Sequence, residues 1–223
     1  MDYILDSRKR SYSLISNKKE DEKKNDNNEE LKKQKKSMIW DGLNEASLLS
    51  SVKNHIYFYS GVTKKSCMNL NLEITKVANN LMTNKNNFAN LDQYIYLHIN
   101  SFGGDIWAAM AAIDIILDSE IPVITIVEGC AASSATLMSI AGHKRYITKH
   151  SYMLIHQLSS SFWGKMNEIE DEVHNLEKLM SVIRNVYKKF TKIPEKDLDE
   201  ILKHDIWWDA KKSKKMGLID KII

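Results

Sequence analysis

Ser133 stands at a point where an apolar strand is expected to turn into a helix. The run 128–135 places small residues on both sides of this serine. Such a turn exposes the hydroxyl and directs free helix N-terminal amides toward the group that the hydroxyl attacks. An isolated serine at a helix start is more often an ordinary N-cap, and this run is not the G-x-S-x-G elbow of the α/β hydrolases. The serine therefore needs partners before it indicates an enzyme.

A base and an acid follow further along the chain. His156 comes directly after the apolar run 153–155, and ligands gather at the carboxyl ends of strands in parallel α/β sheets. Asp205 precedes the apolar and aromatic stretch 206–208. Taken alone, the histidine fits a core or edge position, and the aspartate fits a cap or a surface charge. Together with Ser133 they supply a nucleophile, a general base and an orienting carboxylate.

Two consecutive glycines, Gly103 and Gly104, lie between a candidate strand and a candidate helix. Without side chains, their backbone amides can approach a substrate oxygen closely, although a tight structural turn is an equally simple explanation. With the three side chains named above, these amides complete the set of groups that acyl transfer requires.

Strands and helices are expected to alternate from about residue 54 onward. The apolar patterns predict strands over 56–59, 94–99, 123–127, 152–155 and 218–223. They predict helices over 70–82, 106–117, 131–141 and 165–190, one from Pro194 to about Lys203, and a short one between Asp209 and Gly217. Continuous apolar strands between helices indicate a mostly parallel sheet that is covered on both faces.

The predicted helix over 165–190 carries one apolar stripe, which must pack on a partner. The stripe consists of residues that recur every three or four positions: Ile169, Val173, Leu176, Met180, Ile183, Tyr187 and Phe190. We therefore expect part of this stripe to be buried between subunits.

A length of 223 residues suits one domain with an appendage. Residues 1–37 are expected to be a disordered charged tail, because the segment after residue 17 is too polar to offset chain entropy by burial. A solvated helix with paired Glu and Lys side chains is the alternative for this segment. Residues 38–52 are interpreted as a linker or N-terminal segment, and residues 53–223 as the folded domain.

Composition excludes several classes of function. The chain has 32 Lys and Arg against 29 Asp and Glu, with the signs interspersed, so nucleic acid is not an expected partner. Cys67 and Cys130 have no metal-ligand spacing, and we expect free thiols, with a disulfide as the alternative, and no metal. Since no apolar run has the length of a signal peptide or a membrane span, we expect no membrane association and a cytoplasmic protein, with an organelle matrix as the alternative.

The order of these motifs resembles the ClpP family of ATP-dependent protease subunits. The resemblance extends over residues 53–223 and rests on several motifs in the same order: Lys53-Asn54-His55-Ile56-Tyr57-Phe58 with Ser60-Gly61, the turn from Asn100 to Gly104, Gly129 to Ser133, Met153-Leu154-Ile155-His156-Gln157, and Gly217-Leu218-Ile219-Asp220. An ordered set of motifs is far more specific than any one of them.

The resemblance implies an α/β chain with the ClpP/crotonase-like fold, which consists of repeated β-β-α units and a long protruding helix. It implies that Ser133 is the nucleophile, His156 the general base and Asp205 the residue that orients the histidine. It places the oxyanion hole at the backbone amides of Gly104 and Ser134. Neither a metal nor a cofactor is implied.

The resemblance also implies a serine endopeptidase subunit that cleaves unfolded polypeptides inside an oligomeric chamber. The assembly would be a homo-oligomer of stacked seven-membered rings, with the helix over 165–190 lying between the rings. A separate AAA+ unfoldase would use ATP to supply the polypeptide substrates.

The chain also departs from the family pattern at several positions. Phe102 and Leu158 stand where the family usually has proline, and Ser134-Ala135 replaces a common Met-Gly pair. The serines 159–161 replace a glycine-containing stretch that helps to join two rings. Upstream of Lys53 there is no good counterpart of the family's N-terminal axial loop, so docking to an unfoldase has the least support.

Three alternatives remain open at this stage. A non-catalytic structural ring subunit fits the departures, but not the intact Ser133, His156 and Asp205. A crotonase-type acyl-CoA enzyme shares the fold class, but more often places carboxylates around its oxyanion hole. A Ser-Lys peptidase needs a lysine base where this chain has His156.

Overall fold

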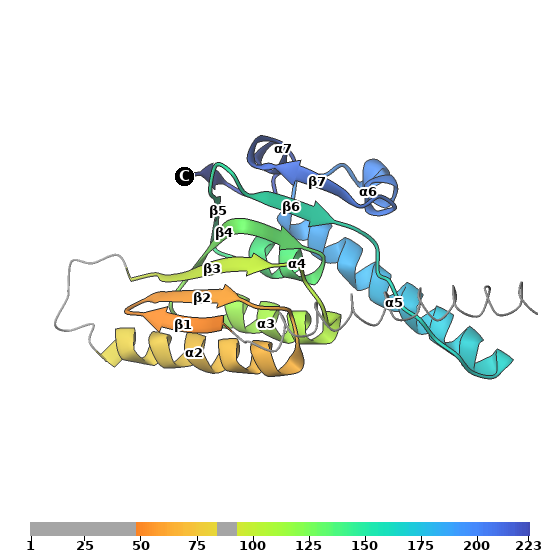
Figure 1. Cartoon of the computed structure of the whole chain (residues 1–223), viewed down its shortest axis with the longest axis horizontal. Coiled ribbons are helices and arrows are strands. Elements are labelled where there is room, and N and C mark those ends of the chain that lie inside the picture. Colours follow the sequence, from red (N-terminus) through yellow and green to blue (C-terminus); the bar gives the residue numbers. More distant parts are fainter. Residues whose placement is uncertain (1–47, 84–92) are drawn as a thin grey trace, which may run out of the picture. The chain divides into compact units, whose positions relative to one another are not determined.

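Eight strands and six helices make up the residues that the computed structural model describes, which are 48–83 and 93–223 (Figure 1). The strands are β1 Leu48–Val52, β2 His55–Tyr59, β3 Ile95–Ser101, β4 Val123–Ala132, β5 Lys144–Ile147, β6 Tyr152–Ile155, β7 Ile206–Asp209 and β8 Lys221–Ile222. The helices are α2 Lys64–Thr83, α3 Ile106–Asp118, α4 Ser134–Ile140, α5 Met166–Phe190, α6 Glu195–Leu202 and α7 Ala210–Lys215. The predicted charged tail, residues 1–37, lies outside the described residues.

Most strand pairs are parallel, in agreement with the alternation of strands and helices along the chain. The sheet runs in the order β1-β2-β3-β4-β5-β8, and β6 and β7 extend from β4 as a branch. Among the strands of residues 48–83 and 93–223, only the β1–β2 and β6–β7 pairs are antiparallel. Residues 48–52, which the sequence placed in the linker or N-terminal segment, form β1.

Strand β4 divides the sheet, and this division creates the site. Its first part, residues 124–127, pairs with β5, whereas residues 130–132 pair with β6. The sequence predicted a helix from residue 131, but the chain remains extended to Ala132 and α4 begins at Ser134. The strand therefore ends immediately before Ser133.

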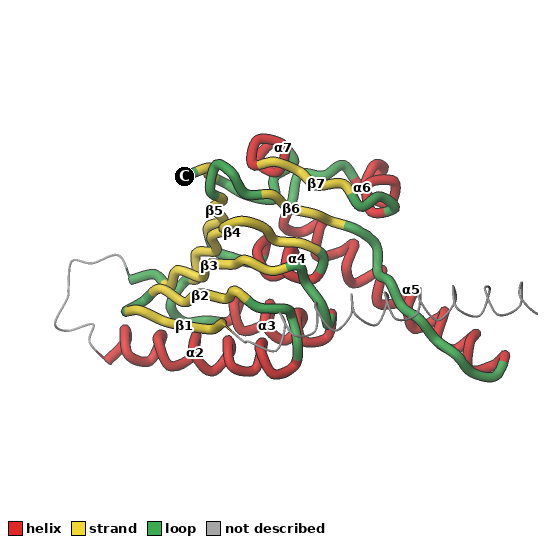
Figure 2. The backbone as a smooth tube through the Cα atoms, in the orientation of Figure 1, coloured by secondary structure: helices red, strands yellow, loops and turns green. Residues whose placement is uncertain are grey.

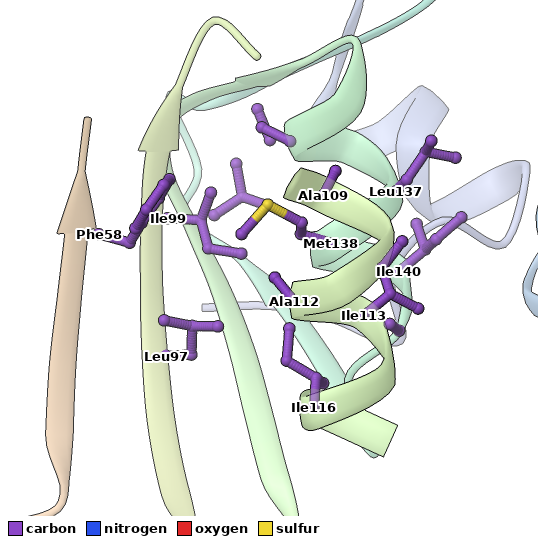
Figure 3. Packing of buried hydrophobic residues seen from close by; sticks show 14 of the residues in the cluster. Phe58, Leu97, Ile99, Ala109, Ala112, Ile113, Ile116, Leu137, Met138 and Ile140 are labelled. Atoms are coloured by element: carbon purple, nitrogen blue, oxygen red, sulfur yellow. The ribbon is translucent and has the colours of Figure 1, made fainter. Parts of the chain in front are cut away.

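The core lies between the sheet and helices α3 and α4 (Figure 3). Phe58, Leu97 and Ile99 point from β2 and β3 toward the two helices, and none of them is exposed. Met138 of α4 fills the space between them and is also fully buried. Each such side chain contributes about 1.5–3 kcal/mol by leaving water. This packing fixes the strand ends that carry the site.

The other face of the central strands carries stacked polar rings. Tyr57 stacks on His98 with ring centroids 4.4 Å apart, and His55 stacks on Tyr96 at 4.6 Å. His98 also bonds to Glu128, with 2.9 Å between Nδ1 and Oε1. The rings on β2 and β3 therefore cover one another on this face.

Helix α5 is the longest helix and projects away from the sheet (Figure 1). Near its C-terminal end Ile183 and Tyr187 are buried, whereas Val173 in its outer half is 51% exposed. Residues 156–165, which lead into α5, form neither helix nor strand and run beside it (Figure 2). Within the described ranges, no helix has both the length and the apolar character needed to cross a membrane.

Candidate active site

Ser133 occupies the turn between β4 and α4 in a strained conformation. Its φ of 56° and ψ of −128° are unusual for a residue with a side chain, and such strain persists only where the surroundings enforce it. The Ser133 amide donates to the Leu154 carbonyl at 2.9 Å, and its carbonyl accepts from Thr136 at 3.0 Å. The hydroxyl makes no capping bond to α4, so the ordinary N-cap interpretation does not apply.

The buried Thr136 side chain stabilises this turn by hydrogen bonds to both strands. Its hydroxyl lies 2.9 Å from the carbonyl oxygens of both Ala131 and Leu154. These two carbonyls belong to the paired ends of β4 and β6, directly beside Ser133. The turn that presents the nucleophile is therefore fixed by both strands.

The glycine turn after β3 approaches Ser133 closely. A Cβ atom on Gly103, whose φ is 91°, would lie 2.7 Å from the Ser133 Cβ and 3.1 Å from the Ser134 nitrogen. A Cβ atom on Gly104, whose φ is 147°, would lie even closer to the Val62 carbonyl oxygen. Only glycine allows this approach, so the pair is required by geometry and is more than a tight turn.

Two backbone amides remain available at this turn. The Val62 amide donates to the Gly103 carbonyl, and the Asp105 amide donates to the Val62 carbonyl. The Gly104 N–H between them has no acceptor among the described residues. The Ser134 N–H belongs to the first turn of α4, where helix amides have no intrahelical partner. The Ser134 hydroxyl donates to the Gly104 carbonyl at 3.2 Å and links the two residues.

Antiparallel pairing between β6 and β7 brings His156 and Asp205 together. The last registered pair is Ile155 with Ile206, so one further step along each strand places His156 opposite Asp205. Side chains at opposite positions of such a ladder are neighbours. The His156 Nδ1 lies 3.2 Å from the Asp205 Oδ1. The next residue, Gln157, donates its backbone amide to the Leu202 carbonyl at 2.7 Å.

Ser133 and His156 line one cavity of about 330 Å³, together with Gly104 and Ser134. In the described part of the chain, no hydrogen bond joins the Ser133 hydroxyl to His156; such bonds often tighten only when substrate is bound. Asp205 does not line the cavity and reaches it only through the imidazole.

The apolar part of the cavity wall contains residues that the sequence did not assign to the site. They come from α3, α4, the segment after β6, and α5: Ile106, Trp107, Leu137, Leu158, Ile183 and Tyr187. The sequence marked Ile183 and Tyr187 only as part of a helical stripe. The helical period shows which residues share a face, but not that the inner end of the stripe borders the cavity.

Cys130 is the other nucleophilic side chain near this turn. Burial raises the pKa of its thiol, and a backbone hydrogen bond from Ser101 offsets this only in part. A thiol with a raised pKa is a poor nucleophile at neutral pH. Among the described residues, no group of three or more His, Cys, Asp or Glu side chains is arranged to hold a metal ion.

Comparison with known proteins places these features in a family. The family model for Clp protease matches residues 51–223. The ATP-dependent Clp protease proteolytic subunit of Deinococcus radiodurans is 32% identical over 136 residues, which are 60% of this chain and 67% of that protein. The proteolytic subunit 2 of Treponema denticola is 38% identical over 130 residues, 57% of this chain and 65% of that protein. The alignments span about two thirds of each relative's length.

Proposed function

The chain belongs to the Clp protease family as a peptidase subunit, and from this premise we propose that it is a serine endopeptidase with Ser133, His156 and Asp205 as its catalytic triad. The observation that carries the proposal is the Ser133 hydroxyl, which caps no helix, sits on a strained turn, and shares a cavity with an imidazole paired to a carboxylate.

The mechanism assigns one role to each group. In this mechanism Asp205, whose Oδ1 lies 3.2 Å from the His156 Nδ1, keeps the proton on Nδ1, and Nε2 is the base that accepts the Ser133 proton. The serine oxygen then attacks the peptide carbonyl, and the amides of Gly104 and Ser134 stabilise the oxyanion. His156 then gives the proton to the leaving amine. In the second half of the reaction His156 accepts a proton from water, the water oxygen attacks the acyl carbonyl, and His156 returns the proton to the Ser133 oxygen as the acyl group leaves.

We assign unfolded polypeptide as the substrate, cleaved inside a chamber formed by a homo-oligomer. The exposed apolar residues of outer α5, Ile169 at 39% and Val173 at 51%, support burial between subunits. Stacked seven-membered rings and a separate ATP-dependent unfoldase belong to the same proposal, which rests on the family. The crotonase-type alternative finds no support in the family match.

A fluorophosphonate probe tests the nucleophile directly. The wild-type protein should label at Ser133 and hydrolyse short peptides, whereas Ser133→Ala should do neither while retaining its melting temperature and assembly state. His156→Ala should lose nearly as much activity, and the double variant little more, because triad residues act as a unit. Ser160→Ala, an exposed serine outside the cavity, is the matched control and should label like wild type.

The outcome also separates enzyme from scaffold. If the assembled wild-type protein neither labels at Ser133 nor hydrolyses peptides, and Ser133→Ala cannot be distinguished from it, the chain is a non-catalytic ring subunit.

A further inference from the structure

Phe102 and Trp207 meet beside the site, although 105 positions of sequence separate them. Their rings lie edge to face, with centroids 6.3 Å apart and an interplanar angle of 88°. Phe102 immediately precedes the glycine turn, and Trp207 lies two residues after Asp205. Both side chains are partly exposed, Phe102 at 59% and Trp207 at 41%, so the contact is not a by-product of the core.

Strand register explains how these two rings reach each other. Ser101 is paired with Ala131, so Phe102, one step further, lies beside Ala132. Ala132 is in turn paired with Leu154, and Leu154 with Trp207. The four residues form one row across the ends of β3, β4, β6 and β7. Ala132 and Leu154 lie between the two aromatic residues in this row and are only 4% and 8% exposed.

The carboxylate of Asp205 has little else to hold it in place. Its side chain is 76% exposed, and among the described residues it forms an ion pair with His156 alone. Strand β7 begins one residue later and, of the strands that the structure describes, pairs with β6 alone. Because alternate residues of an extended chain share a face, Trp207 projects on the same side as Asp205. The ring contact is therefore a second attachment for the start of β7.

We propose that Phe102 and Trp207 are positioning residues, whose contact holds the start of β7 against the glycine turn and so keeps the Asp205 carboxylate on His156. The inference rests on the proposed triad. It adds that the orientation of the exposed carboxylate depends on two aromatic side chains that take no chemical part in the proposed triad.

Peptide hydrolysis by Phe102→Leu and Trp207→Leu tests the proposal. Each variant should lower kcat about threefold to tenfold, the range expected for loss of an aromatic pair, and leave KM within about twofold. Trp207→Phe and Phe102→Tyr, which retain an edge-to-face contact, should recover most of kcat. The control is Ile206→Ala on the same strand, an exposed residue on the opposite side from Trp207, which should retain wild-type kcat.

A second arm separates positioning through Asp205 from a general structural effect. In an Asp205→Ala background, measured by the rate of fluorophosphonate labelling, Trp207→Leu should have no further effect. If Trp207→Leu lowers the labelling rate equally with Asp205 present and with Asp205→Ala, the proposal is overturned. It is also overturned if the leucine variants change only KM, or if both keep the wild-type kcat. If the wild-type protein does not label at Ser133, the proposed function fails and the positioning role with it; labelling with unaffected variants refutes the positioning role alone.

Discussion

Gly103→Ala should damage the site by placing a methyl group against the nucleophile residue. The new Cβ would lie 2.7 Å from the Ser133 Cβ and 2.6 Å from the Ala132 carbonyl oxygen, whereas ordinary contacts begin near 3.4 Å. Ser133 or the glycine turn must therefore move by about 0.7 Å. A displacement of this size at a reacting group costs roughly a hundredfold in rate.

The backbone adds a stability cost of its own. Gly103 has a φ of 91°, where a side chain costs about 1–3 kcal/mol. Gly217→Ala is the matched control, because its φ of 75° carries a comparable penalty and its Cβ would meet Lys192, not the site. Both variants should melt at lower temperature, but only Gly103→Ala should lose kcat/KM for peptides and labelling rate, by about tenfold to a hundredfold. Wild-type kcat/KM in a folded Gly103→Ala protein would refute the placement of this turn against the nucleophile.

Two further predictions concern assembly and acid stability. Replacing Val173 and Leu176 by Asp should convert a larger particle into smaller ones in light scattering, and a wild-type monomer at micromolar concentration would contradict the intersubunit role of α5. Burial raises the pKa of Asp220, but hydrogen bonds and charge from Arg145 lower it more, so the pKa lies below its ordinary value. The resulting stabilisation is present above the ordinary pKa and is lost as pH falls through the folded one. Asp220→Asn should thus lower the free energy of unfolding by about 1 kcal/mol at pH 7, a small value because the carboxylate is partly exposed, and by less near pH 3 in denaturant titrations. An equal loss at both pH values would show that the carboxylate's charge is not responsible.

Much of the fold follows from local pattern in this sequence. The strand ending before His156 and the helix after Asp105 lie where the apolar patterns predicted them, because the strand buries a continuous apolar run and the helix buries one face. Asp209 caps the short helix α7 by accepting from the Lys212 amide at 2.7 Å, as its position before that helix predicted. These features depend on neighbours within a few residues, which sequence periodicity records.

The elements that the sequence missed depend on pairing between distant segments. Strand β5 has a mixed apolar and charged sequence, and it forms because Arg145 and its neighbours pair with β4 and β8. Strand β7 carries no alternation that marks it, yet its register with β6 is what sets Asp205 opposite His156. Sequence spacing could name the three triad candidates, but could not supply the register that joins two of them.

Phe102 and Leu158 stand at two positions where the family resemblance leads us to expect proline, and each contacts a distant element of the fold. Proline has a fixed φ and no amide hydrogen. Here the Leu158 amide donates to the Met180 sulfur at 3.2 Å, which ties the segment after His156 to α5. Phe102 instead contributes a ring that meets Trp207. Each replacement exchanges local stiffness for a contact with a distant element, so we expect the geometry of this site to depend on α5 and β7 more than on the turns themselves.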